Sequence, residues 1–149
     1  MSTNSGKHGV SSLCAVAVAV AAAAVFAVAA RSAAAPQLSA KLVGTWSRQL
    51  TQSDVTKGKP EIPAALLVGT KCTLSLKSTG AAHLACGKLL GQFNGSVTPT
   101  GSTNVRIDVG DGRPNTYRWS VSGSVLTLTK VTDPSTNRIT IFGGAWHRS

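Results

Sequence analysis

The sequence predicts an all-β protein, a compact closed barrel of eight antiparallel strands in up-and-down order. Three observations support this fold class. Short segments of alternating apolar and polar residues recur at regular intervals between turn residues, a spacing typical of sandwiches and barrels. Gly, Ser and Thr are plentiful, and the composition does not suit a helical bundle. The motif GTWSR at residues 44–48 nearly repeats as GAWHR at residues 144–148, at the two ends of the part predicted to fold.

The N-terminal residues 1–35 are predicted to be a secretory signal peptide and a short linker, and residues 36–149 the barrel domain. A polar start that contains Lys7 is followed by an apolar stretch at 13–30 and then by small residues, which is the layout of a secretory signal. An uncleaved membrane anchor is the alternative, although eighteen helical residues span only about 27 Å. We therefore expect a secreted protein.

The predicted strands cover residues 42–50, 71–77, 81–86, 89–97, 104–109, 116–121, 125–130 and 138–148. The long connection at 51–69 has room for a short helix that starts near residue 53. A two-residue turn around Gly123 joins the clearest hairpin, and both possible positions of this turn place Trp119 opposite a leucine. Side chains alternate along a strand, so each segment is expected to turn its apolar residues toward one face.

The cysteines of the predicted mature chain, Cys72 and Cys86, are expected to form a disulfide, because an even pair in an oxidising compartment favours one. Folding this hairpin so that Cys72 faces Cys86 also sets Leu74 opposite Leu84 on the same face. The apolar face and the cysteine pair therefore require the same register. Two unpaired thiols are the alternative, and a metal site is not expected since no matching pair of histidines is present.

The repeated motif has a geometric explanation. In an up-and-down barrel with an even number of strands, the first and last strands are antiparallel neighbours, and their pairing removes the exposed edges. Pairing Trp46 with Arg148 also sets Arg48 opposite Trp146. Each guanidinium then lies near an indole face, a contact worth roughly 0.5–2 kcal/mol. The alternative is that the tryptophans are separate core residues and the arginines are solvated.

These residues resemble a known pattern. Gly44-x-Trp46 on the first strand, with an arginine near the last strand, resembles the lipocalin and calycin families, in which the Trp closes one barrel end and an Arg packs across it. The C-terminal part is similar to small secreted bacterial lipocalin-like proteins, whose Y-x-W, L-x-L and terminal W-x-R elements match Tyr117, Trp119, Leu126, Leu128, Trp146 and Arg148. The resemblance covers about residues 41–148 and implies a carrier for a small apolar ligand.

The ligand would lie in the barrel or at its mouth. The candidate lining residues are the inward-facing Trp46, Arg48, Phe93, Tyr117, Trp119 and Leu128. The alternative is that they form a solid core, because eight strands leave an interior just wide enough for packed side chains or one small ligand. Arg48 shares its face with Trp46, and either receives a ligand carboxylate or caps the barrel end.

A second resemblance is to calycin-like bacterial inhibitors of secreted metalloproteases. These proteins also have a short N-terminal arm, then G-x-W, then one disulfide across early strands. The corresponding arm here is about residues 33–42. This resemblance implies a secreted protease as partner, with the arm entering its cleft, and it stands as the alternative to the carrier.

Catalysis is not expected. The predicted mature chain has only His83 and His147, and it contains none of the common nucleophile, metal or nucleotide motifs. We expect no enzyme activity, no cofactor and no metal. Fifteen Lys and Arg stand against five Asp and Glu, but they are spread thinly and the aromatic residues share faces with leucines. The charge therefore predicts solubility, a non-specific affinity for anionic surfaces and no specific nucleic acid partner. We expect the protein to be a monomer.

Overall fold

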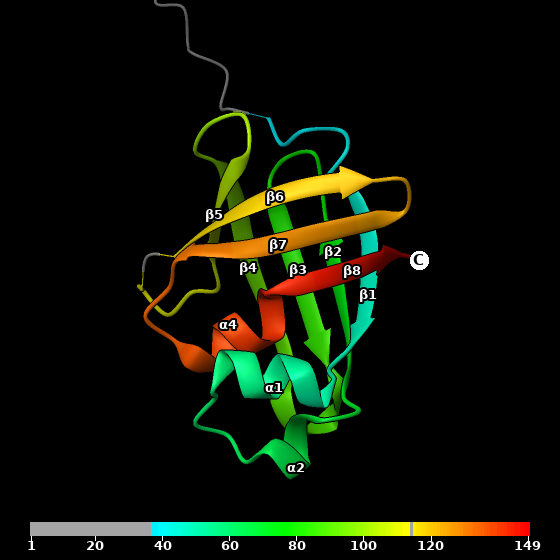
Figure 1. The fold of residues 1–149 in the computed structure, drawn as a ribbon. Coiled ribbons are helices and arrows are strands. Elements are labelled where there is room, and N and C mark those ends of the chain that lie inside the picture. The colour runs from blue at the N-terminus through cyan, green and yellow to red at the C-terminus, as the bar shows by residue number, and fades with distance from the viewer. Residues whose placement is uncertain (1–36, 114) are drawn as a thin grey trace, which may run out of the picture. The chain divides into compact units, whose positions relative to one another are not determined.

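The computed structural model describes residues 37–113 and 115–149, so the predicted signal peptide lies outside the described residues. The described chain forms a closed barrel in which each strand pairs with the next and the last pairs with the first (Figure 1). All pairs are antiparallel, which confirms the predicted fold class. The strands are β1 Gly44–Gln49, β2 Lys71–Leu76, β3 Ala81–Cys86, β4 Gly91–Pro99, β5 Asn104–Asp108, β6 Thr116–Ser122, β7 Val125–Thr132 and β8 Gly144–Arg148.

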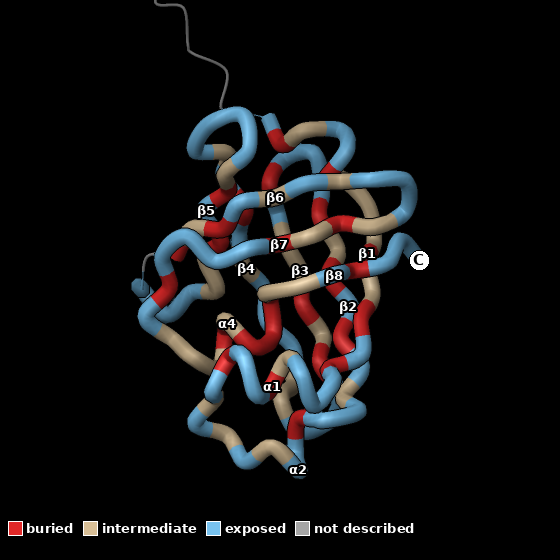
Figure 2. The backbone as a smooth tube through the Cα atoms, viewed as in Figure 1, coloured by how far each residue is buried: buried red, intermediate tan, exposed pale blue. Residues whose placement is uncertain are grey.

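The β2–β3 hairpin has the predicted register. Cys72 lies opposite Cys86 and Leu74 opposite Leu84, and the two cysteines form the predicted disulfide. The β6–β7 hairpin turns at Gly123-Ser124, because Ser122 pairs with Val125, and this choice sets Trp119 opposite Leu128. Buried residues alternate with exposed or partly buried ones along β2 and along the first half of β7, as the red, tan and pale segments of the tube show (Figure 2).

The barrel closes where β1 meets β8. Trp46 pairs with Arg148 and Ser47 with His147, which is the register that the repeated motif predicts. β8 continues on its other side into the pairing with β7. The two related motifs are therefore adjacent antiparallel strands, and the described sheet has no free edge at this seam.

Three short helices precede the C-terminal part of the barrel. α1 spans Gln52–Gly58, close to the predicted start, and Thr51 and Asp54 form a capping box at its N-terminus. α2 spans Ala64–Leu67 and α3 spans Gly87–Leu90. The first helix lies across one end of the barrel beside α4, the helix described next (Figure 1).

One strand prediction was wrong in its first half. Residues 138–148 were expected to be one strand, but α4 spans Thr136–Phe142 and only β8 is extended. Ser135 caps α4 by accepting a hydrogen bond from the Arg138 backbone. The β-branched residues of this segment favour a strand, but tertiary packing overrides that preference. α4 packs against α1 so closely that a Cβ on Gly58 would lie 2.0 Å from Thr140 Oγ1.

The barrel wall opens beside the first half of β4. β3 pairs with β4 from Gly91 to Ser96, but β5 pairs with β4 only from Ser96 onward. At Gly95 the end of β5 passes so close that a Cβ would lie 2.0 Å from the Asp108 carbonyl oxygen, which is the role of a glycine where another backbone approaches. Phe93 precedes this crossing and lies opposite the buried Leu84 of β3. It is nevertheless 40% exposed, because the wall is open beside it.

Candidate functional site

The centre of the barrel is a packed aromatic core. Trp46, Tyr117 and Trp146 are fully buried, and Phe142 of α4 is nearly so. The indole N–H groups of both tryptophans donate to main-chain carbonyls four residues earlier, on Leu42 and Phe142, at 2.9 Å. Both polar atoms are satisfied, as buried tryptophans require. The solid core that the sequence left open as an alternative therefore describes the barrel axis.

Arg48 caps one end of the barrel. Its guanidinium carbon lies 5.5 Å from the centre of the Trp146 ring, and it forms an ion pair of 2.6 Å with Asp54 of α1. It also donates to the carbonyl oxygens of Ile141 and Gly143. Burial raises the pKa of Asp54, but hydrogen bonds from the Thr51 backbone and hydroxyl and from Arg48 outweigh that effect and hold the pKa below its usual value. The two terminal nitrogens of Arg48 are thus bound by groups of the chain itself, whereas its buried Nε has no hydrogen-bond partner among the described residues.

Arg148 caps the seam at the other end of the motif pair. Its guanidinium carbon lies 4.3 Å from the centre of the Trp46 ring, and it donates to the carbonyl oxygens of Lys41 and Val43. Leu38 and Leu42 are buried in the same region. The predicted free arm at 33–42 is therefore packed against the barrel from Leu38 onward, and its first residues lie outside the described part.

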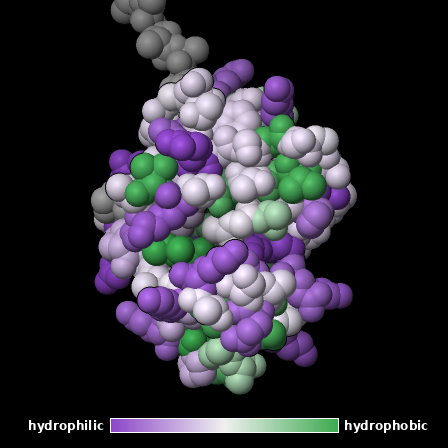
Figure 3. Space-filling view, in the orientation of Figure 1, coloured by the Kyte–Doolittle hydropathy of each residue, from purple (hydrophilic) through white to green (hydrophobic). Residues whose placement is uncertain are grey.

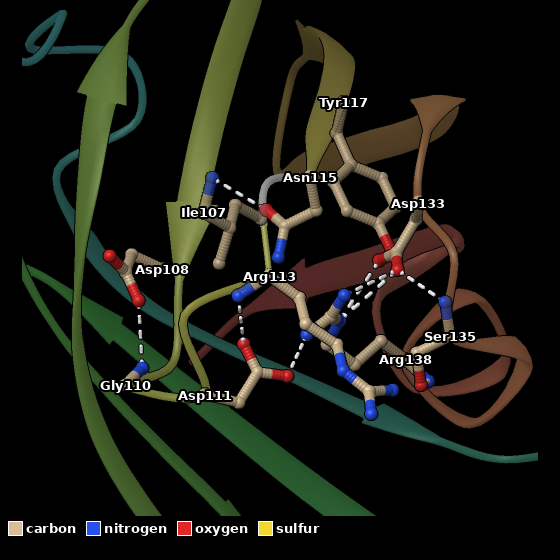
Figure 4. Close-up of polar contacts among 10 residues, drawn as sticks. All are labelled: Ile107, Asp108, Gly110, Asp111, Arg113, Asn115, Tyr117, Asp133, Ser135 and Arg138. Atoms are coloured by element: carbon tan, nitrogen blue, oxygen red, sulfur yellow. Dashed lines mark hydrogen bonds and ion pairs between the residues drawn. The ribbon is translucent and has the colours of Figure 1, made fainter.

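A buried polar cluster, which the sequence analysis missed, lies between β6 and α4 (Figure 4). The Tyr117 hydroxyl donates to Asp133 at 2.6 Å, and Arg138 donates to both oxygens of the same carboxylate. Arg138 also pairs with Asp111. The sequence offers only a weak signal for this cluster, because Asp133 and Asp111 both lie in segments that look like ordinary turns.

The cluster fixes the ionisation of its members. Burial raises the pKa of Tyr117 well above its usual value, and its hydrogen bond to Asp133 adds to the effect. Burial also raises the pKa of Asp133, but hydrogen bonds from Arg138, Tyr117 and the Ser135 backbone outweigh this and lower it. The hydrogen bonds to Asp133 raise the pKa of Arg138. Every acidic and basic group is already paired within the cluster, so its geometry fits a structural role.

The opening beside β4 leads to a small apolar cavity. Its volume is about 50 Å³, and it is lined by Leu84, Phe93, Val109, Arg138, Ile141 and Phe142. A neighbouring space between the same strands measures about 10 Å³. Typical ligand sites measure roughly 300–1,000 Å³, so this cavity is too small for an organic ligand.

A cleft of ligand size lies between β7 and the two helices α1 and α4. Its volume is about 310 Å³. β8 pairs with β7 only as far as Leu128 and Gly144, and there the chain between α4 and β8 turns away and leaves the side of β7 uncovered (Figure 1). We call this the α1–β7 cleft, and its lining residues are Asp54, Lys57, Gly58, Thr127, Leu128, Thr129, Lys130, Ile139, Gly143 and Gly144.

The α1–β7 cleft combines an apolar floor with a polar rim. Leu128 is buried and Ile139 is partly buried, whereas Lys57, Thr129 and Lys130 are exposed. On this face of the molecule, green apolar patches lie between purple hydrophilic side chains (Figure 3). This combination of apolar contact area and a few polar groups is the usual character of a small-molecule site.

A second groove of about 360 Å³ lies on the β1–β2 surface. It is lined by Ser47, Arg48, Gln49, Lys71, Cys72, Thr73 and His147. No aliphatic side chain lies in it, and Arg48 is already bound to Asp54. It therefore lacks the apolar contact area on which the affinity of a small ligand usually depends.

The predicted lining residues divide into four groups, and Phe93 is the one that lines the small cavity beside β4. Trp46, Tyr117 and Arg48 belong to the core and its end cap. Trp119 is half-buried, packs against the core, and lines a groove of about 190 Å³ at the other barrel end. Leu128 is the single predicted residue that lines the α1–β7 cleft. The sequence analysis did not identify the two lysines of the cleft as site residues. Lys130 could have been noticed, because it follows Leu126 and Leu128 at the next alternate position of the strand.

No protein-family model, curated protein or solved structure matches this chain. The class that the geometry itself defines is an eight-stranded, antiparallel, up-and-down barrel compatible with a calycin-like fold. Within residues 37–113 and 115–149, no helix is long and apolar enough to cross a membrane, and no three His, Cys, Asp or Glu side chains gather as metal ligands.

Proposed function

We propose that this protein is an exported carrier that binds a small organic ligand with an apolar body in the α1–β7 cleft. The observation that carries the proposal is the cleft itself, a space of about 310 Å³ that reaches Leu128 of the barrel core. Filling such a space with apolar atoms stabilises a complex by about 25 cal/mol for each Å² removed from water. The disulfide supports export, because disulfides persist in oxidising compartments.

The neutral fluorescent dye N-phenyl-1-naphthylamine is a suitable probe because it is apolar and brightens when it leaves water. Thr129 lies at the cleft, and its substitution Thr129→Phe should fill part of the space. We expect the dye affinity to fall about tenfold, or roughly 1.4 kcal/mol. Native mass spectrometry of the purified protein, followed by organic extraction, should then show a bound molecule that Thr129→Phe loses.

Thr98→Phe is the matched control. Thr98 and Thr129 are both exposed strand residues, and each lies opposite an arginine of the neighbouring strand, Arg106 and Arg118 respectively. Only Thr129 lines the cleft. A wild-type protein that does not bind the dye, or equal binding by the two variants, would refute the proposed site.

A further inference from the structure

Lys130 occupies a position that a barrel normally gives to an apolar residue. Leu126 and Leu128 precede it at alternate positions of β7 and are buried, and Lys130 pairs with the fully buried Tyr117 of β6. Side chains two residues apart share a face of a strand, so Lys130 follows the inward face. It is nevertheless exposed, because the wall opens into the α1–β7 cleft at this point.

The main chain of Lys130 also faces the cleft. The two-residue turn at Gly123-Ser124 makes Ser122 and Val125 a hydrogen-bonded pair. Alternate residues of β7 therefore direct their N–H groups to β6 and to β8 in turn. The carbonyl of Ser124 accepts a hydrogen bond from the Arg148 backbone on the β8 side. Lys130 lies an even number of positions after Ser124, so its main-chain groups are also directed to the β8 side.

β8 provides no partner for this main-chain group. The last pair between the strands joins Leu128 to Gly144, and the residues before Gly144 belong to α4 and its C-cap. The N–H of Lys130 therefore points toward the cleft beyond the end of the β7–β8 ladder. An N–H beyond the end of a strand ladder is free to donate to water or to an oxygen atom of a bound ligand.

The charge of the cleft is positive. Lys57 of α1 and Lys130 both line it, and neither is part of an ion pair among the described residues. Asp54 is the one carboxylate in the lining, and Arg48 and Thr51 already bind it. The two lysines therefore face the cleft without a carboxylate of the chain to neutralise them.

We propose that the ligand carries an anionic oxygen group, held by Lys57 and by the ammonium and main-chain N–H of Lys130, while its apolar body lies against Leu128 and Ile139. The ligand class is a small organic acid, with a carboxylate, sulfate or phosphate as the anionic group. This inference rests on the proposed function, since it assigns the chemistry of the same cleft. Charge-assisted hydrogen bonds of this kind are stronger than neutral ones.

Two related dyes test the inference. 8-Anilinonaphthalene-1-sulfonate has the same aromatic body as N-phenyl-1-naphthylamine and adds one sulfonate. We expect the wild-type protein to bind the sulfonate dye about tenfold more tightly than the neutral dye, as one charge-assisted contact would give. Lys57→Gln and Lys130→Gln should each weaken the sulfonate dye about fivefold and leave the neutral dye within about twofold.

The control variants separate a local effect from net charge. Lys77→Gln removes the same charge from an exposed lysine directly after β2. Lys77 does not line the cleft, so this variant should change the affinity of neither dye. Lys130→Arg keeps the charge and should retain most of the sulfonate affinity. Competition by sodium sulfate beyond that by sodium chloride of equal ionic strength would identify a site that also takes a free inorganic anion.

The outcomes distinguish the two proposals. If both dyes bind in the cleft but the lysine variants weaken them equally, or Lys77→Gln acts like Lys130→Gln, the anionic group is refuted and the carrier function stands. If the neutral dye does not bind, or if Thr129→Phe changes the affinity of neither dye, the cleft is not an apolar ligand site and both proposals fail. Thermal unfolding of each variant should match the wild type, so that a loss of binding reports the site.

Discussion

The guanidinium of Arg148 lies over the indole of Trp46, 4.3 Å from its guanidinium carbon to the ring centre, at the seam where the first strand of the barrel meets the last. Arg48 and Trp146 form the reciprocal pair at 5.5 Å. The two pairs differ in their surroundings, because Arg48 is buried and bound to Asp54 whereas Arg148 is exposed. The two copies of the motif therefore make similar contacts that should contribute unequally to stability.

Replacing the two arginines should show this inequality. Arg48→Met leaves Asp54 without its ion-pair partner and removes donors from two carbonyls. We expect Arg48→Met to lower the free energy of unfolding by about 2–3 kcal/mol. This is less than for a fully buried ion pair, because Asp54 is partly exposed. Arg148→Met should lower the free energy of unfolding by only about 0.5–1 kcal/mol, as expected for the loss of an exposed cation–π contact. Urea unfolding monitored by tryptophan fluorescence measures both, and an equal or reversed order would contradict the unequal roles.

Much of the fold follows from local sequence patterns because they agree with one another. The hairpin of β2 and β3 has one register that satisfies both Cys72–Cys86 and Leu74–Leu84, and the structure has that register. The seam is predictable for a similar reason, since two Trp-x-Arg motifs fit together in only one antiparallel register. Where two independent features require the same geometry, the sequence is sufficient.

The errors lie where tertiary packing decides. Residues 136–142 contain β-branched side chains typical of strands, but they form α4 because Ile141 and Phe142 fill the barrel end from a helix. Phe93 alternates with Val97 along β4 and lines the small cavity with Leu84, but it is 40% exposed because β5 pairs with β4 only from Ser96 onward. Alternation identifies the face of a strand but not where the neighbouring strand ends.

The candidate site was mostly beyond prediction for the same reason. The α1–β7 cleft exists because β8 is short and two helices replace its missing half, so its lining comes from elements that the sequence does not place together. Leu128 was predicted as a ligand contact, whereas Lys57 and Ile139 belong to helices. Only Lys130 could have been singled out from the sequence, because it places a charge at the inward position that follows two leucines.

Tyr117 should resist ionisation until the protein unfolds. Its pKa in the folded state is raised above 10.0, first by burial and then by its hydrogen bond to Asp133. A raised folded pKa means that this group contributes stability fully below pH 10, and that the contribution is lost as pH rises further. The chain contains one tyrosine, so the tyrosinate absorbance reports this residue alone.

We expect the tyrosinate signal to appear together with loss of the circular dichroism of the fold, at a pH above that of free tyrosine. Tyr117→Phe should abolish the signal and make stability less dependent on pH in the alkaline range. A normal titration in the folded protein, with an apparent pKa near 10.0, would contradict the buried hydrogen bond.

The disulfide should stabilise the barrel without defining its register. The cysteines are 14 residues apart, and a loop of this length corresponds to about 3 kcal/mol in the chain-entropy treatment. The variant Cys72→Ala/Cys86→Ala should therefore unfold at lower urea concentration but keep the native fold, because Leu74 and Leu84 still pair on the inner face. Amide exchange of β2 and β3 measures this, and loss of their mutual protection under native conditions would show that the disulfide sets the register.

Gly95 should be the least replaceable glycine of β4. Its φ does not lie in the left-handed region, so alanine is compatible with the backbone and only space decides the effect. A Cβ there would lie 2.0 Å from the Asp108 carbonyl oxygen and 3.2 Å from Val109 Cα. Both neighbours are main chain, which cannot rotate away as a side chain can. Gly95→Ala should therefore force β5 away from β4 and cost at least about 3 kcal/mol.

Ser96→Ala is the control, because Ser96 is the adjacent, exposed residue of the same strand and its loss should change stability by no more than about 0.5 kcal/mol. Separation of the strands should also widen the opening that leads to the small cavity beside Phe93. Gly95→Ala should accordingly bind more N-phenyl-1-naphthylamine than the wild type, and Thr129→Phe should not remove the added binding because it lies at a different site. Stability equal to that of Ser96→Ala would mean that β4 and β5 do not cross at this glycine as closely as the structure shows.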